Sequence, residues 1–243
     1  MATDKKSGNL LDTLRAQSDA VRGQDKGVRS TPEDALKELD RKVWKAFKWL
    51  DEAIGHLAVI RPVVAHEYRI ADILTIASPQ FDQGFVSYRR KAFAGYEAVE
   101  YIELFYRLAL PKAIDVVVPV SAVGGVDDRL RAAQLKFQYR PVQDDDRVVR
   151  RGMFSVTPAV TGFVKFQPDY RRQAVEVTLR NVDRFETVIV EFAADKFVDS
   201  TLEDLVRFIL GEDNAFLRRA PLVGIGARKP QLLPNEEVTS YRV

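Results

Sequence analysis

Tyrosine is followed directly by arginine more often in this sequence than its composition explains. Six of the eight tyrosines precede an arginine, although arginine is only 24 of 243 residues and chance would give about one such pair. The pairs are Tyr68-Arg69, Tyr88-Arg89, Tyr106-Arg107, Tyr139-Arg140, Tyr170-Arg171 and Tyr241-Arg242. Because arginine contacts phosphate in a bidentate manner and tyrosine stacks on bases, these pairs could bind nucleic acid or another phosphorylated ligand.

The β-strands expected to carry these pairs favour a different role for them. Neighbouring residues of a strand point to opposite faces, so each pair would place its tyrosine in the core and its arginine in solvent. Acidic residues accompany the arginines, as Glu67 accompanies Arg69 and Glu176 accompanies Arg180. A face with both signs of charge is typical of a cross-strand ladder of ion pairs. Anion binding through the pairs is therefore an alternative hypothesis.

Basic residues also gather where strands are expected to start or turn. If these strand ends meet in the folded chain, they would form an anion-binding site; if they do not, they are solvated loop ends. The candidate anion-binding residues are Arg89, Arg90, Arg140, Arg150, Arg151, Arg171 and Arg172.

The sequence holds few other groups that metal binding or catalysis requires. It has no cysteine, which excludes a thiol nucleophile and every cysteine-based metal site. Its two histidines, His56 and His66, lack ligand spacing, so we predict no metal site and no cofactor. Glu67, Glu103 and Tyr106 are groups that an enzyme could use, but we predict no catalytic residue.

The composition is that of a globular protein with a substantial core. Hydrophobic residues make up 46% and charged residues 30%, and the formal net charge of +2 gives no general attraction to nucleic acid or membranes. No apolar stretch is long enough to span a membrane, and no secretory signal is recognisable, so we expect a cytoplasmic protein without membrane insertion. The 24 arginines against 13 lysines suit a bacterial protein from a GC-rich genome.

A long amphipathic helix is predicted from Pro32 to Ile60. Thr31 can cap its first turn, Pro32 suits the first helical position, and Arg61-Pro62 ends it. Apolar residues recur every three or four positions along the helix, in a stripe wider than a coiled-coil seam. We therefore expect it to pack on a sheet, with self-association or a protein partner along helix 32–60 as the alternative.

Two tryptophans of this helix are candidate contacts for a partner. Trp44 and Trp49 lie on different sides of the helix, so one of them can remain exposed. Because exposed tryptophans are frequent in protein interfaces, we predict a partner interface at these two residues.

After residue 62 the apolar period changes from 3.6 to two, which predicts strands. Strands are expected at about 63–70, 85–91, 98–109, 114–120, 135–140, 147–157, 160–167, 173–181 and 186–193. The Gly124-Gly125 pair should break the pattern before a short helix at 126–134. Ser200 and Glu203 form a possible capping box for a helix at 201–210, with Gly211 at its end.

The predicted fold class is α+β. We expect a long N-terminal helix packed on a mostly antiparallel, curved sheet of about eight to nine strands, with a short middle helix and a C-terminal helix. Residues 31–222 should form a single domain (helix 32–60, strands within 63–120, helix 126–134, strands within 135–193, helix 201–210). Residues 1–30 should form a flexible N-terminal arm and residues 223–243 a C-terminal tail.

Three classes of function remain on this evidence. A non-enzymatic binding or interaction module is favoured, because a sheet with helices across it can offer an open edge or a groove. Binding of nucleic acid or a phosphorylated ligand through the Tyr-Arg strands and basic turns is one alternative. An enzyme that uses carboxylate, arginine or tyrosine groups is the other.

Overall fold

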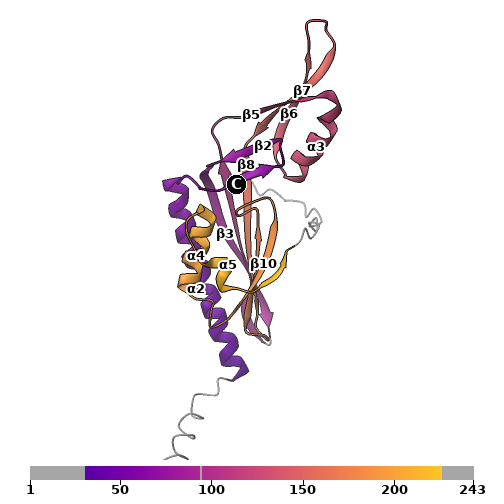
Figure 1. Ribbon diagram of the computed structural model, residues 1–243. Helices are drawn as coiled ribbons and strands as arrows, with labels where there is room; N and C mark the ends of the chain where they lie inside the picture. Colours follow the sequence, from indigo (N-terminus) through magenta and orange to yellow (C-terminus); the bar gives the residue numbers. More distant parts are fainter. Residues whose placement is uncertain (1–30, 94, 226–243) are drawn as a thin grey trace, which may run out of the picture.

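The computed structural model describes residues 31–93 and 95–225, and these form the predicted α+β fold (Figure 1). The predicted N-terminal arm, residues 226–243 of the predicted tail, and the Tyr241-Arg242 pair lie outside the described residues. None of the described helices is long and apolar enough to cross a membrane.

Helix α2 spans Pro32–Ile60, as predicted. Thr31 and Asp34 form a reciprocal capping box at its start, and Arg61 ends it in the left-handed conformation (φ 50°). Its apolar stripe is buried from Leu36 to Leu57 and packs on β3 and β4, so the helix is part of the core.

The strands are divided among three antiparallel sheets, whereas one sheet of eight to nine strands was expected. The bounds are β1 Glu67–Ile70, β2 Leu74–Ala77, β3 Gln80–Phe93, β4 Tyr96–Ala109, β5 Ile114–Pro119, β6 Lys136–Gln143, β7 Val149–Thr157, β8 Ala159–Asp169, β9 Ala174–Arg180, β10 Thr187–Ala193 and β11 Leu222–Ile225. The largest sheet has the order β11-β10-β9-β8-β4-β3, a second has the order β5-β7-β6, and β1 pairs with β2.

Two strands were not predicted. β2 follows β1 through a tight turn, and the chain then reverses at Ser78 (φ 51°), so β3 begins at Gln80 where a turn over 79–84 was expected. β11 pairs with β10, so regular structure continues past residue 222, where we expected a tail. Both segments are only four residues long, and the alternation of buried Leu74 and Ile76 in β2 is too short to stand out in the sequence.

Two helix starts also differ from the expectation. Helix α3 spans Val123–Ala132 after the 3-10 turn η1 (Val120–Ala122), so Gly124 and Gly125 lie inside it and do not break it. Helix α4 spans Asp199–Leu210 without the expected Ser200–Glu203 capping box, because the helix begins before Ser200, with Val198 at the N-cap position. The Ser200 hydroxyl accepts a hydrogen bond from Arg219 instead (2.7 Å). Arg219 closes α5 (Phe216–Arg219).

The helices α2, α4 and α5 lie on one face of the six-stranded sheet (Figure 1). Along β4, Leu104, Tyr106 and Leu108 are buried beneath these helices. The alternate residues point to the other face, where Phe105 is half-buried and Arg107 is exposed. We call the second side of the sheet the open face. It is the surface on which side chains from β3, β4, β8, β9 and β10 meet solvent.

The unit made by β5, α3, β6 and β7 is inserted between β4 and β8, which are neighbours in the large sheet. Ala109 at the end of β4 lies opposite Ala159 at the start of β8, and Leu110 donates a backbone hydrogen bond to Pro158 at 3.0 Å. The chain thus leaves and rejoins the large sheet at adjacent positions.

Candidate functional site

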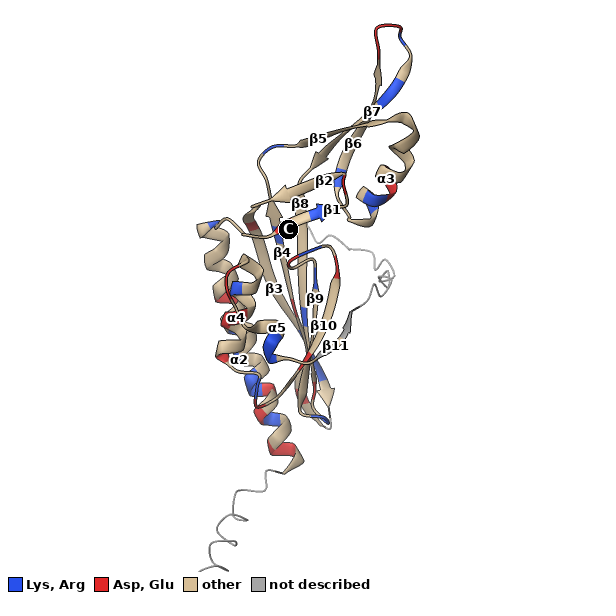
Figure 2. Ribbon diagram, in the orientation of Figure 1, with Lys and Arg blue, Asp and Glu red and all other residues tan. Residues whose placement is uncertain are grey.

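The seven arginines proposed for anion binding fall into two separate groups. Arg89, Arg90, Arg171 and Arg172 lie at the end of the six-stranded sheet that is remote from the inserted unit. Arg140, Arg150 and Arg151 lie on β6 and β7 within that unit, at the other end of the molecule (Figure 2). The structure therefore does not bring the basic turns together into one site.

Four of these arginines are already paired with carboxylates. The pairs are Arg89–Glu100 (3.1 Å), Arg90–Asp40 (3.1 Å), Arg150–Asp144 (2.8 Å) and the bidentate Arg172–Glu191 (2.7 and 2.8 Å). Within the described residues, Arg140, Arg151 and Arg171 have no carboxylate partner. Arg140 instead contacts the Met153 sulfur, and Arg171 lies over the Phe93 ring. An anion would have to displace an ion pair at most of the proposed positions.

The two tryptophans lie on opposite flanks of α2, and both are half-buried. Trp44 packs against Phe47 and, on β3, against Tyr88, with ring centroids 5.0 and 4.9 Å apart. The Arg90 guanidinium lies 5.5 Å from the Trp44 ring centre. Trp44 therefore borders the outer edge of the large sheet, while Trp49 lies on the flank that faces α4.

A buried carboxylate joins α2 to three other elements. Asp40, only 3% exposed, accepts hydrogen bonds from the Val99 backbone N–H (2.8 Å), the Tyr96 hydroxyl (3.0 Å) and Arg90 (3.1 Å). The Tyr170 hydroxyl lies 3.2 Å from Asp40 and donates to the Val99 carbonyl at 2.7 Å. With its lone pairs occupied by these donors, Asp40 serves as a structural acceptor rather than a free base.

The tyrosines around Asp40 are held in the protonated form. Burial, and secondarily the Asp40 carboxylate, raises the pKa of Tyr170 far above its usual value. The hydrogen bond to Asp40 is the main cause that raises the pKa of Tyr96. Neither hydroxyl is therefore available as a base near neutral pH.

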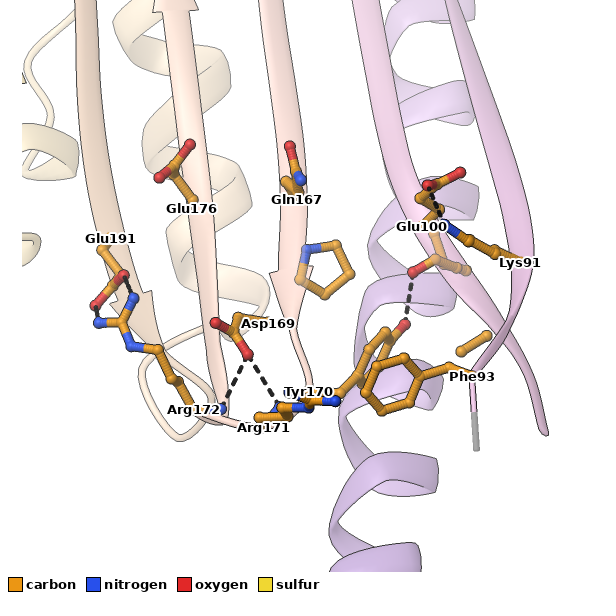
Figure 3. Close-up of a pocket in the computed structure, with 13 residues that line it drawn as sticks. Lys91, Phe93, Glu100, Gln167, Asp169, Tyr170, Arg171, Arg172, Glu176 and Glu191 are labelled. Carbon is orange, nitrogen blue, oxygen red and sulfur yellow. Dashed lines mark hydrogen bonds and ion pairs between the residues drawn. The ribbon is translucent and has the colours of Figure 1, made fainter. Parts of the chain in front are cut away.

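A groove of about 350 Å³ lies beside this cluster, at the end of the open face (Figure 3). Its apolar wall is formed by Phe93, Ala98, Val99, Pro168 and Tyr170. Its polar lining is Lys91, Glu100, Gln167, Asp169, Arg171, Arg172, Glu176 and Glu191. Because cationic and anionic groups alternate around it, the groove has no strong preference for either sign of charge.

The open face carries a row of aromatic rings that crosses three strands. Phe85 of β3, Phe105 of β4 and Phe163 of β8 are directly opposite one another in the ladder. Their ring centroids are 5.1 Å apart for the first pair and 4.8 Å for the second. Phe85 is 60% exposed, and the Arg180 guanidinium of β9 lies 5.2 Å from the Phe163 ring centre. We call Phe85, Phe105 and Phe163 the aromatic row.

Charges of both signs surround the aromatic row. Lys165 pairs with Glu103 at 3.5 Å, and Arg107 pairs with Asp82 at 2.9 Å. By contrast, Glu176 and Arg180 of β9 form no ion pair with any described residue. Glu176 lies directly opposite Glu191, whose charge is compensated by Arg172.

The groups considered for catalysis lie in unrelated environments. Glu67 pairs with Arg69, and Glu103 pairs with Lys165 on the open face. Tyr106 is buried on the opposite face of the same strand. The structure therefore does not assemble Glu67, Glu103 and Tyr106 into an active site.

Comparison with known protein families, with curated proteins and with solved structures found no match for this chain.

Two features were missed from the sequence. Asp40 stands on the apolar stripe of α2, three residues before Val43 and four after Leu36, and this spacing was the available signal of a buried carboxylate. The aromatic row left no local signal, because its three members come from distant segments and only the strand register aligns them.

Proposed function

We propose that this protein is a non-enzymatic binding module that docks a segment of another protein on its open face. The observation that carries the proposal is the aromatic row, which remains solvent-accessible although the alternate residues of β4 and β8 are buried. Exposed aromatic clusters of this kind mark interaction surfaces, and aromatic side chains supply much of the binding energy there.

The two uncompensated charges of β9 suggest the chemistry and the direction of the partner. Glu176 and Arg180 are four residues apart on one strand, a separation of roughly 13 Å. A fitting segment would bring an acidic group to Arg180, apolar side chains to the aromatic row beside it, and a basic group to Glu176. Phe163 lies directly opposite Arg180, so the aromatic row is level with Arg180. Complementary charges at two ends would fix the orientation of that segment.

Nucleic acid is the less favoured ligand for this face. Glu103, Glu176 and Glu191 lie on the same surface as the basic groups, and they would repel a phosphate backbone. A partner protein, by contrast, can match both signs of charge.

We further propose a cytoplasmic location and a bacterial origin. The lack of cysteine suits a reducing compartment, and the excess of arginine over lysine suits a GC-rich genome. These two points rest on composition alone.

The proposal is tested with a display library of random twelve-residue peptides selected on the immobilised full-length protein. Selected peptides should carry apolar residues beside an acidic residue, and a basic residue farther along the peptide. Their affinity should fall about tenfold or more for Phe105→Ser and for Arg180→Glu.

Arg140→Glu is the matched control, because this exposed arginine lies on the inserted unit. Peptides that bind Phe105→Ser and Arg180→Glu as tightly as the unaltered protein would contradict docking on the open face. So would a selection that enriches no peptide. Circular dichroism of each variant should match the unaltered protein, since the changed side chains lie outside the buried core.

A further inference from the structure

The edge of the large sheet at β3 has a free stretch in its middle. The start of β3 is covered, because Gln80 bridges Val63 and the Phe81 N–H donates to the Pro62 carbonyl at 2.9 Å. Among the described strands, β3 pairs only with β4, which leaves its outer side unpaired beyond this point. We call residues 83–88 the free β3 edge.

The free β3 edge lacks the devices that normally protect an edge strand. The charged residues of β3 are Asp82, Arg89, Arg90 and Lys91, all outside residues 83–88, and the two register shifts of the ladder also fall outside it. The stretch is flanked by exposed aromatic side chains, Phe85 on the open face (60% exposed) and Tyr88 on the helix face (44%). An uncharged, exposed edge of this kind is a template for pairing with another strand.

We infer that the free β3 edge pairs antiparallel with the same edge of a second copy, joining two six-stranded sheets across a two-fold axis near Val86. In such an interface the residues close to the axis meet themselves or a near neighbour in the other copy, so a charge there would repel its own copy. The uncharged stretch satisfies this requirement. With the axis at Val86, antiparallel pairing also places Asp82 of one copy opposite Arg90 of the other, next to Arg89. In-register parallel pairing would instead place Arg89 beside Arg89.

Helix α2 is aligned with this axis. Tyr88 packs against Phe47 with ring centroids 4.6 Å apart. Gly84 lies beneath Ile54 so closely that an added Cβ would be 2.7 Å from the Ile54 methyl group. Val86 is therefore level with the middle of this helical segment, near Leu50. A two-fold axis at Val86 would set the α2 helices of the two copies antiparallel, side by side, around the same level.

The flank of α2 that would face the second copy is self-complementary. Trp44, Lys48, Asp51 and Gly55 follow a spacing of three to four residues and so share one stripe on the β3 side. Lys48 and Asp51 are exposed and have no ion-pair partner among the described residues. Centred near Leu50, Lys48 of each copy would meet Asp51 of the other. Gly55 leaves open space for the approaching helix.

This inference shares Phe85 with the proposed docking function but does not rest on it, because it depends on the backbone of residues 83–88 and on the flank of α2. An unrelated extended peptide could also add to an edge strand, but it would not require the helix flank to complement itself. The pairing of Lys48 with Asp51 therefore distinguishes a second copy from another partner.

Sedimentation of the full-length protein over a range of concentrations tests the inference. The expected result is a dimer whose Kd rises about tenfold or more in Lys48→Asp and in Asp51→Lys, because like charges then meet across the axis. The double swap Lys48→Asp with Asp51→Lys should restore the affinity. A second variant, Ser87→Lys, should also weaken the dimer, since it places two ammonium groups near the axis.

Thr161→Lys is the control, because Thr161 is exposed on β8, away from the edge. It should leave the Kd unchanged. A protein that is monomeric at every concentration overturns the inference. A dimer whose Kd is unchanged in Lys48→Asp, Asp51→Lys and Ser87→Lys also overturns the inference, because the two copies would then associate through another surface.

Discussion

The carboxylate of Asp40 accepts the backbone N–H of Val99 at 2.8 Å and thereby joins the buried face of α2 to β4. Arg90 and Tyr96 donate to the same carboxylate from the β3–β4 hairpin. Asp40 lies among apolar neighbours on α2, and its charge is stabilised there only by these donors. The contact is therefore a point where the stability of the fold depends on a single side chain.

We expect Asp40→Ala to lower the free energy of unfolding by about 3–5 kcal/mol, because it leaves Arg90 and a backbone N–H without their buried acceptor. Urea unfolding measures the change. Glu52→Ala is the control on the exposed side of the same helix and should stay within about 0.5 kcal/mol of the unaltered protein. A loss below about 1 kcal/mol for Asp40→Ala would show that water or a rearrangement replaces the carboxylate.

Stability should fall as the pH rises above about 10. Burial raises the pKa of Tyr68, Tyr106 and Tyr170 above the usual tyrosine value. The unfolded chain therefore releases these protons near pH 10 while the folded chain keeps them, so the stabilisation present below pH 10 is lost at higher pH.

Each buried tyrosine should contribute a slope of about 1.4 kcal/mol per pH unit above pH 10. Tyr68→Phe should reduce the slope by the contribution of one tyrosine, although it also removes the hydrogen bond to the Val182 carbonyl (2.5 Å). Tyr139→Phe, at an exposed position, provides the comparison. Urea unfolding repeated between pH 8 and 12 checks the slope, and equal slopes for all three proteins would refute the assignment.

Gly162→Ala should destabilise the fold by about 1–3 kcal/mol through overpacking. Gly162 lies directly opposite Tyr106 in the ladder, and an added Cβ would be only 2.1 Å from the Cζ atom of that ring. In a Tyr106→Leu background the obstructing ring atoms are gone, so the additional cost of Gly162→Ala should shrink. Thermal unfolding of the four proteins in this double-mutant cycle measures the coupling, and purely additive effects would argue against the contact.

Gly125→Ala should have the opposite effect to Gly162→Ala and raise the free energy of unfolding by about 0.5–1 kcal/mol. Gly125 lies within α3, and no atom is found within 4 Å of the position that its Cβ would occupy. An alanine there reduces the freedom of the unfolded chain without a steric cost. A lower melting temperature for Gly125→Ala would mean that the helix start needs the glycine conformation.

The N-terminal helix was predictable because its signals are local. Thr31, Pro32 and Arg61 act within one turn of the residues that they start or end, and the apolar stripe between them needs no distant information. Two of the five described Tyr-Arg pairs follow the predicted alternation, since Tyr68 and Tyr106 are buried while Arg69 and Arg107 are exposed. Tyr88 and Tyr139 are exposed and do not follow it.

The division into three sheets was not predictable in the same way. β4 pairs with β8 across the whole inserted unit, and no pattern within either strand records that choice. The same limit applies to the candidate site, because the neighbours of Phe105 are fixed by register, and register depends on long-range pairing. Residue types alone therefore left anion binding through the arginines open as an alternative, whereas the folded chain pairs four of the seven candidate arginines with carboxylates.

The close approach of Ala109 and Ala159 makes the inserted unit a replaceable module. Whatever length of chain separates these two residues, β4 and β8 can keep their ladder, because the connection starts and ends at one hydrogen-bonded corner. Changes in the length of residues 111–157 need not shift the aromatic row, as long as the new segment covers the core that Val116, Leu130 and Phe154 share with the large sheet. The same corner offers protein engineers a site at which a foreign domain could be grafted onto an unchanged sheet.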